Sequence, residues 1–158
     1  MSDIFNLEDA FTMIEQVGLI TNRVERAGQL VNQIQQQFSE IKIFNGQRVL
    51  YMIWRKPWMS AGQNTFINHM LSLIGLRNCV AAERYPELSA SALTQLSPDF
   101  VFLSSEPYPF KEKHIAELQS LLPNARICLV DGEMFSWYGS RLLKFPDHQR
   151  SLLSQLNA

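Results

Sequence analysis

Three short segments of the sequence combine aromatic and charged side chains, and each segment follows an apolar run. Tryptophan and tyrosine rings stack on flat ligand faces, and arginine pairs with carboxylate or phosphate groups. A site that binds without making bonds needs little more than apolar surface and a few orienting polar groups. The segments therefore predict a surface for a large, partly apolar, charged ligand. The candidate ligand-binding residues are Arg55, Trp58, Glu106, Tyr108, Phe110, Glu133, Phe135, Trp137, Tyr138 and Arg141.

Packing roles compete with binding roles for several of these side chains. Phe135 and Trp137, each taken alone, could equally well cover the end of a sheet. A structural salt bridge explains Arg141 as well as a ligand contact does. Trp54 also belongs to this region, but it closes an apolar run, and we expect it to pack in the core.

Enzymatic chemistry finds little support in the sequence. Glycine-rich phosphate loops of the dinucleotide and P-loop types are absent, and no serine lies in a nucleophile elbow. His69, His114 and His148 lie far apart within helical patterns, so solvated or hydrogen-bonded histidines are expected rather than metal ligands. Glu106 and Glu133 could approach as an acid/base pair, but no nucleophile or cofactor loop accompanies them. We therefore expect a binding protein without catalytic residues, cofactor or metal site.

Composition narrows the classes further. The chain has 158 residues, 46% of them hydrophobic and 18% charged, as in one globular domain. A net charge of −1 gives no electrostatic reason to expect nucleic acid as a partner. The apolar runs are too short to cross a bilayer, and residues 1–6 lack the basic start and apolar stretch of an export signal. Cys79 and Cys128 each lie in an apolar segment and are expected to be core residues.

The elements that must position the three segments alternate between strand and helix. Apolar runs over 48–54, 76–81, 100–103 and 125–130 predict buried strands, and helical patterns cover 65–74, 89–96 and 111–122. A last helical pattern reaches the C-terminus and is interrupted at Phe145-Pro146. Such alternation predicts a three-layer α/β/α fold with a short parallel sheet. Ligands bind at the carboxyl ends of such strands, where the loops over 55–64, 104–110 and 131–141 would meet.

A long helical segment precedes the first strand. Asn6 is a candidate N-cap for a helix that should stop at Gly18, and a second helix with a glutamine-rich outer face should end near Glu40. No strand lies beside these helices in the sequence. We therefore expect a helical segment over 1–44, an α/β unit over 45–158, and a chain start that lies inside a larger architecture.

The order and spacing of several motifs resembles the C-terminal lobe of the helical-backbone periplasmic binding proteins, which deliver iron-siderophores, haem or cobalamin to ABC importers. Residues 6–41 are similar to the segment that links the two lobes of that family, including its long backbone helix. The motifs are Arg48-Val49-Leu50 leading to Ser60-Ala61-Gly62, Thr65-Phe66-Ile67 to Gly75 and Asn78, Ser89 to Leu93, Ser97-Pro98-Asp99, and Trp137-Tyr138-Gly139-Ser140-Arg141.

The resemblance implies one lobe plus the backbone helix of a receptor that holds a metal chelate or macrocycle between two lobes, with the N-terminal lobe missing. It implies an ABC permease as partner and a periplasmic location if the full-length protein is exported. Family members often dock on the permease through a glutamate, but Ser91 stands at that position, and Glu83 or Glu87 could replace it. Loops that normally face a second lobe would be exposed here, so we also expect this chain to dimerise.

Two other functions stay open at this point. A cytoplasmic two-lobed enzyme or assembly module of nitrogenase-like architecture would have the same fold class, although fold alone is a poor guide to function. A stand-alone interaction domain could instead use the aromatic segments to bind a protein. A second lobe and an export signal upstream of residue 1 would favour the receptor.

Overall fold

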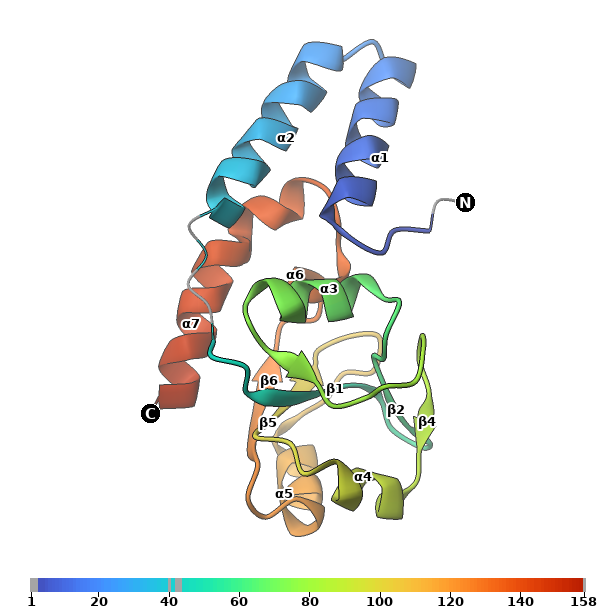
Figure 1. Cartoon of the computed structure of the whole chain (residues 1–158), viewed down its shortest axis with the longest axis vertical. Helices are drawn as coiled ribbons and strands as arrows, with labels where there is room; N and C mark the ends of the chain where they lie inside the picture. The colour runs from blue at the N-terminus through green and yellow to red at the C-terminus, as the bar shows by residue number, and fades with distance from the viewer. Residues whose placement is uncertain (1–2, 40, 42–43, 158) are drawn as a thin grey trace.

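The structure is a computed structural model that describes residues 3–39, 41 and 44–157. A sheet lies between helices on both faces, and two N-terminal helices extend beyond one helical layer (Figure 1). The strands are β1 (Arg48–Trp54), β2 (Trp58–Ser60), β3 (Arg77–Asn78), β4 (Glu87–Leu88), β5 (Phe100–Ser104) and β6 (Arg126–Val130). The helices are α1 (Leu7–Ile20), α2 (Val24–Ser39), α3 (Phe66–Leu73), α4 (Ala90–Leu96), α5 (Glu112–Leu121), α6 (Glu133–Ser136), the 3₁₀ helix η1 (Ser140–Lys144) and α7 (Phe145–Asn157).

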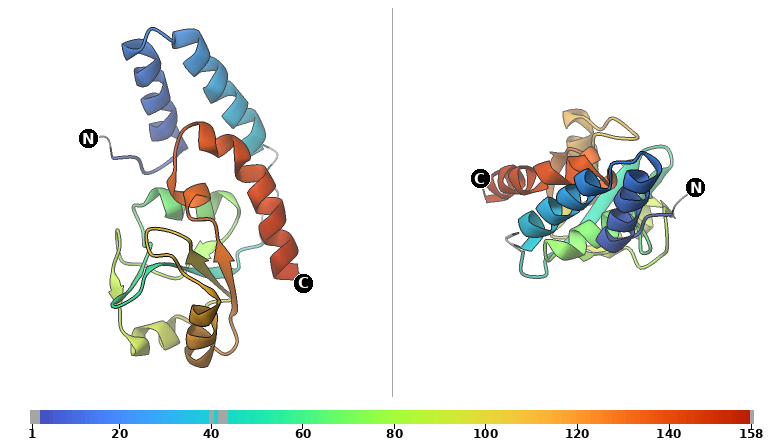
Figure 2. Two further views of the ribbon diagram at one scale, coloured as in Figure 1. Left: turned by 180° about the vertical axis from the view of Figure 1, so that it is seen from behind. Right: turned by 90° about the horizontal axis from the view of Figure 1, so that it is seen from above.

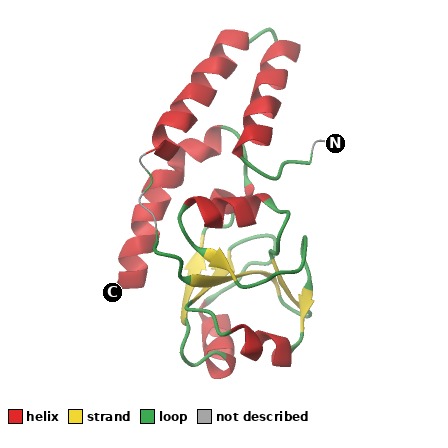
Figure 3. Ribbon diagram, in the orientation of Figure 1, coloured by secondary structure: helices red, strands yellow, loops and turns green. Residues whose placement is uncertain are grey.

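The strands form one sheet, drawn in yellow in Figure 3. Its order is β4-β2-β1-β5-β6, with β3 paired to the beginning of β1. β3, β5 and β6 run parallel to their neighbours, which confirms the predicted parallel core. The prediction of a loop over 55–64 was wrong in part, because Trp58–Ser60 turns back as antiparallel β2 and pairs with β4. A strand of three residues is too short to show a hydrophobic period, and Pro57 and Gly62 beside it favoured a loop.

Both faces of the sheet are covered, and β1 shows why its sequence is continuously apolar. Tyr51 and the residues two before and two after it pack with α1, α2, α3, α6 and α7. Leu50 and Met52 pack on the other face with Leu93 of α4 and Leu118 of α5. Alternate residues of a strand point to opposite faces, so a strand buried on both sides has no polar positions. The three-layer α/β/α prediction is therefore confirmed.

Helices α1 and α2 form an antiparallel hairpin that projects beyond the α3 and α6 layer (Figure 2). Asn6 caps α1 as predicted, accepting a hydrogen bond from the Asp9 amide at 2.8 Å. The predicted stop at Gly18 was wrong, because α1 continues to Ile20. Gly18 instead lies at the crossing of the two helices, where an added Cβ would come within 2.5 Å of the Ala27 Cβ. The expected end of the second helix at Glu40 lies outside the described residues.

The C-terminal segment is divided differently from the predicted pattern. Helix α6 and η1 come first, and Phe145-Pro146 begins α7 rather than interrupting a helix. Proline is well tolerated in the first turn of a helix, since its missing N–H has no acceptor there. Phe145 is buried against Phe135 of α6, so the start of α7 is fixed by packing. Within the described part of the chain, none of the helices has the length and apolar character needed to span a membrane.

Candidate functional site

A cavity of about 330 Å³ lies at the carboxyl ends of β1 and β5, where the sequence pattern placed the ligand. Its volume is at the lower end of the range for small-molecule sites. Most of its lining is apolar, and Glu106 is the one charged side chain among the described residues that form it. The lining residues are Ile53, Trp54, Met59, Ile67, Tyr85, Ser104, Glu106, Pro107 and Ser136.

Hydrogen bonds fix the carboxylate of Glu106 at the cavity wall. Its Oε1 atom accepts from Ser136 Oγ at 2.8 Å and from Trp137 Nε1 at 2.9 Å. Behind it, the Tyr51 hydroxyl donates to Ser104 Oγ at 3.3 Å, and Ser104 Oγ donates to the Glu106 carbonyl at 2.5 Å. Burial raises the pKa of Tyr51, so its phenol remains a donor. The hydrogen bonds from Tyr51 of β1 to Ser104 of β5, and from Ser104 to the Glu106 carbonyl, therefore orient the backbone of Glu106. Ser136 and Trp137 orient its side chain.

Close packing joins the loop after β6 to the loop after β5. An added Cβ on Gly132 would lie 2.2 Å from Ser104 Oγ and 2.7 Å from Glu106 Cγ, so no larger residue fits without displacement. The Gly132 amide also donates to Ser105 Oγ at 3.0 Å. The two loops thus form one wall of the site, and the sequence alone did not indicate the role of Gly132.

Arg55 has an acidic partner within the chain. Its Nε and Nη2 atoms each lie 2.7 Å from a carboxylate oxygen of Glu117 on α5. The guanidinium also lies 5.5 Å from the centre of the Trp58 ring. The hydrogen bonds of this pair raise the pKa of Arg55 and lower the pKa of Glu117. A ligand anion would have to compete with a bidentate carboxylate for this arginine.

Arg141, in the loop after β6, also has acidic partners within the chain. Its Nη2 atom forms ion pairs with Glu133 and, at 3.4 Å, with Asp131. Glu133 and Arg141 were both predicted to contact the ligand, and the structure brings them to each other instead. Their charges offset one another beside the cavity, and neither residue lines it.

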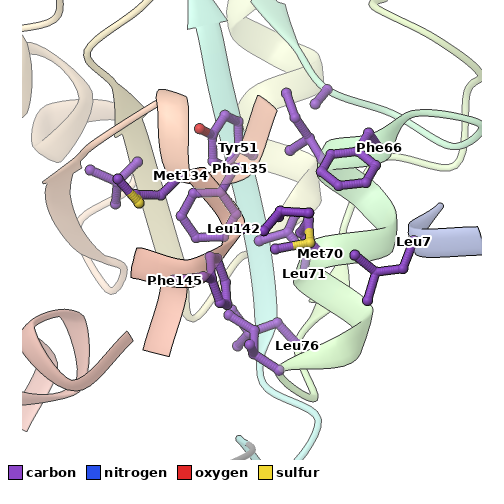
Figure 4. Packing of buried hydrophobic residues seen from close by; sticks show 14 of the residues in the cluster. Leu7, Tyr51, Phe66, Met70, Leu71, Leu76, Met134, Phe135, Leu142 and Phe145 are labelled. Atoms are coloured by element: carbon purple, nitrogen blue, oxygen red, sulfur yellow. The ribbon is translucent and has the colours of Figure 1, made fainter. Parts of the chain in front are cut away.

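The predicted aromatic residues divide into buried and exposed groups. Phe135 is completely buried between Tyr51 and Phe145 (Figure 4), whereas Trp137, two residues later, is 53% exposed. Phe110 is buried in the core beneath the other face, with Trp58 stacked on it at an interplanar angle of 2°. Burial leaves Phe110 and Phe135 without surface for a ligand, because the core covers both rings.

Tyr108 and Tyr138 lie beside the cavity and outside its lining. The Tyr108 ring packs edge-on against Trp54 at 5.6 Å, and its hydroxyl lies 3.2 Å from Nε2 of His114. Tyr138 is partly exposed and packs edge-on against Phe66 of α3 at 5.4 Å. Tyr108 therefore supports Trp54 in the cavity wall, and Tyr138 adds an exposed ring beside the cavity.

His114 anchors the loop over 105–110 to α5. Its Nδ1 atom accepts from the Lys111 amide at 2.9 Å, so the neutral ring carries its proton on Nε2 and donates to Tyr108. Burial is the main reason that the pKa of His114 is lowered, which favours this neutral form. The ring thus acts as a structural hydrogen-bonding group, as the sequence suggested for the histidines.

Glu106 is the only one of the ten predicted residues that lines the cavity. Trp54 lines it too, and the expectation that Trp54 packs in the core was wrong, since its ring is 39% exposed. Tyr85 was missed because it precedes a proline in a segment without strand or helix periodicity. Ile53 had a detectable signal, because it is the second-last residue of an apolar strand that ends at the binding edge.

Other hollows and clusters are less suited to binding a partly apolar ligand. Two larger hollows of about 500 and 550 Å³ lie along the helical hairpin and are lined mainly by polar and charged side chains. Among the described residues, no group of three or more His, Cys, Asp and Glu side chains is placed to hold a metal ion. Burial raises the pKa of Cys79, and that of Cys128 to about 12, so both remain unreactive thiols.

Comparisons with known proteins identify a family for the sequence and similar folds for the structure. The family model described as periplasmic binding protein matches residues 2–122. The chain superposes on a possible iron-binding periplasmic solute-binding protein of Staphylococcus epidermidis with a TM-score of 0.78 and 18% identity, covering 99% of this chain and 64% of that one. The periplasmic heme-binding protein HutB of Vibrio cholerae superposes with a TM-score of 0.79 and 20% identity, covering 97% of this chain and 66% of that one. The periplasmic vitamin B12 binding protein BtuF of Vibrio cholerae superposes with a TM-score of 0.67 and 18% identity, covering 99% of this chain and 63% of that one.

The chain therefore spans less than two thirds of the length of these solved proteins, and at such identities the likeness establishes the fold alone. No curated protein matches the sequence.

Proposed function

Because the chain belongs to the periplasmic binding protein family, we propose that it is a ligand-binding lobe of a solute receptor for a metal chelate or macrocycle of the iron-siderophore, haem or cobalamin kind. One observation carries the proposal. An apolar cavity with a single oriented carboxylate lies at the carboxyl ends of β1 and β5, the edge at which α/β sheets bind ligands. The similar structures include a possible iron-binding protein and binding proteins for heme and vitamin B12, and the last two ligands are macrocycles with large apolar surfaces.

We propose further that this lobe faces a second one in the complete receptor. The similar structures are longer than this chain by more than a third of their own length, which is space for another lobe. Residues 1–44 would then form the helical connection and residues 45–158 the lobe. Exposed Trp54, Tyr85 and Trp137 lie at the open side of the cavity or beside it and would meet the ligand there.

The family and the similar structures are binding proteins, and we propose the same for this chain rather than an enzyme. Among the described lining residues the oriented carboxylate has no histidine, lysine, cysteine or second acid beside it, and its serine neighbours use their hydroxyl protons to hold Glu106. Such a wall can hold and orient a ligand.

Family members are periplasmic, and we propose the periplasm and an ABC permease as the setting of the full-length protein. Ser91, which stands where a docking glutamate is expected, exchanges a hydrogen bond with Ser89 at 2.9 Å. Glu83 and Glu87 are exposed on the segment before α4 and could supply the acid. Reversing the charge with Glu87→Lys should then weaken binding to the permease, whereas Ser91→Ala should not.

The proposed function is tested by titrating the chain with haem, cyanocobalamin and a ferric hydroxamate chelate while tryptophan fluorescence is recorded. At least one ligand should quench the emission saturably, with a dissociation constant above roughly 1 μM, because one lobe buries only one side of the ligand. Substituting Trp54 with alanine should weaken that binding. Absence of saturable binding by all three ligands would contradict the proposal, and sub-micromolar binding would show that no second lobe is needed.

We also propose that the isolated chain associates with a second copy. Large apolar side chains are exposed around the turn of the α1 and α2 hairpin, and monomers rarely tolerate extended apolar patches. A two-fold contact that buries the same patch on both copies is the commonest arrangement. These side chains are Val17, Leu19, Ile20 and Val24.

A further inference from the structure

The cavity has an uncompensated negative charge. Glu106 accepts both of its side-chain hydrogen bonds on Oε1, and no described residue donates to Oε2. No lysine, arginine or histidine is present among the described lining residues. A carboxylate at an apolar wall attracts a cation more strongly than one in water, because the surrounding dielectric constant is lower.

The arginines closest to this region have other partners. Arg55 is held by Glu117, and Arg141 is held by Asp131 and Glu133. Arg84 lies over the rings of Phe5 and Tyr85 and donates to the Asn64 carbonyl at 3.3 Å. Arg84 forms no ion pair with a described residue, but it lies outside the cavity lining, on the Tyr85 ring. A ligand carboxylate inside the cavity would therefore meet Glu106 and no lining cation, and it would be repelled.

Aromatic rings complete the same site. Trp54 and Tyr85 line the cavity with partly exposed rings, and the Trp137 indole is held against Glu106 by its Nε1 hydrogen bond. The faces of tryptophan and tyrosine rings carry partial negative charge, and they attract ammonium groups, most strongly where water is excluded. An aromatic wall combined with a carboxylate thus selects for positive charge in two independent ways.

We propose that Glu106, Trp54 and Tyr85 form a subsite for an organic ammonium group of the ligand. The inference rests on the proposed receptor function and narrows its ligand class. The chelate or macrocycle would present an amine or quaternary ammonium group to this lobe, and any carboxylates would point elsewhere.

Three probes of the same shape test the charge preference. Choline carries a trimethylammonium head, neohexanol is its uncharged carbon isostere, and tert-butylacetate places a carboxylate beside the same tert-butyl head. We expect the indole N–H resonances of Trp54 and Trp137 to shift on titration, with choline bound about tenfold more tightly than neohexanol. Tert-butylacetate should bind more weakly than neohexanol. Equal affinities for choline and neohexanol, or tightest binding of the anion, overturn the proposal.

Two variants locate the preference. Glu106→Gln keeps the shape and removes the charge, so choline should lose most of its advantage over neohexanol. Glu112→Gln removes the same charge from an exposed position on α5 and should leave the advantage intact. Tyr85 takes part in none of the hydrogen bonds that orient Glu106. Tyr85→Leu should therefore lower the affinity for choline several-fold and leave the affinity for neohexanol unchanged. An equal loss for both probes in Tyr85→Leu overturns the aromatic part of the subsite.

The subsite and the receptor function fail in different experiments. If the chain prefers choline and binds none of the chelates, the ammonium subsite is supported and the proposed receptor function is contradicted. If the chain binds haem, cyanocobalamin or the hydroxamate chelate but shows no preference among the three probes, the receptor function is supported and the ammonium subsite is contradicted.

Discussion

Arg55 and Glu117, which are 62 residues apart, form a two-point ion pair in which both N–O distances are 2.7 Å. The pair joins the end of β1 to α5 across the second face of the sheet. A ligand anion at Arg55, the contact that its position after a strand suggested, would have to compete with Glu117. The same side chain thus fixes the loop that precedes Trp58, with which it makes a cation–π contact.

Glu117→Gln should lower the melting temperature at pH 7, because the amide cannot hold Arg55 as a bidentate carboxylate does. The pKa of Glu117 is lowered by Arg55, so its stabilisation is complete above the ordinary value of 4.5 and is lost as the pH falls through the lower folded-state pKa. The difference between variant and parent should therefore be present at pH 7 and should shrink as the pH falls below 4.5. Both groups are partly exposed, so the effect should be modest, and the exposed Glu112→Gln serves as control.

Gly18→Ala should destabilise the hairpin, because the new methyl group would lie 2.5 Å from the Ala27 Cβ and push α1 and α2 apart. Overpacking of this kind costs about 1 to 3 kcal/mol. Gly28 of α2 is the matched control, since an added Cβ there meets nothing within 4 Å. Gly28→Ala should be neutral or stabilise by up to about 1 kcal/mol through helix propensity. Urea unfolding of both variants would expose an error in the crossing geometry if their effects were equal.

Phe135→Ala and Trp137→Ala should separate packing from binding. Phe135 is fully buried, so its truncation should lower the free energy of unfolding by about 3 to 5 kcal/mol. Trp137 is 53% exposed, so Trp137→Ala should lower the free energy of unfolding by less than about 1 kcal/mol. It should weaken ligand binding, because the Glu106 carboxylate loses the indole hydrogen bond that orients it. Denaturant titration measures the first effect, and ligand titration measures the second. A larger loss of stability for Trp137→Ala than for Phe135→Ala would contradict the assignment.

The strands that position the site were predictable, because continuous apolar runs over β1, β5 and β6 give a strong signal. Their parallel order also placed the three loops at one edge. The antiparallel pair was not predictable: β2 has three residues, β4 has two, and their pairing is a tertiary interaction. Gly18 shows a further limit, since a glycine at a helix crossing has the same sequence signal as a glycine that ends a helix.

The site was predicted by position more successfully than by residue. The ends of β1 and β5 and the loop after β5 do line the cavity. The partners of Arg55 and Arg141 decide which charges remain free, and the partner of Arg55 lies 62 residues away in the sequence. Phe135 and Trp137 differ in burial although both are aromatic residues of one loop, since helix α6 turns Phe135 toward the core. Side-chain direction in a short irregular segment is set by packing, which the linear pattern does not contain.

Stability should fall as the pH is lowered from 7 to 5. Burial lowers the pKa values of His69, His114 and His148 below the ordinary 6.5. The unfolded chain therefore binds more protons in this window, and the stabilisation is complete above about pH 6.5 and declines as the pH falls toward the folded-state values. Thermal unfolding at closely spaced pH values measures the slope. His114→Asn should reduce it, and a stability that rises toward pH 5 would contradict the burial of these rings.

Self-association should depend on the exposed tip of the helical hairpin. Ile20 is 83% exposed at the end of α1, with Leu19 and Val24 exposed beside it. Ile20→Lys should abolish dimerisation, because a desolvated ammonium on a self-complementary patch is placed near its own symmetry copy. The helix itself should tolerate the change, since a cation near a helix C-terminus is favourable. Gln37→Lys adds the same charge at an exposed position of α2 and should dimerise like the parent. Light scattering across a concentration series decides between them, and a parent chain that stays monomeric at millimolar concentration would show that this patch needs no partner.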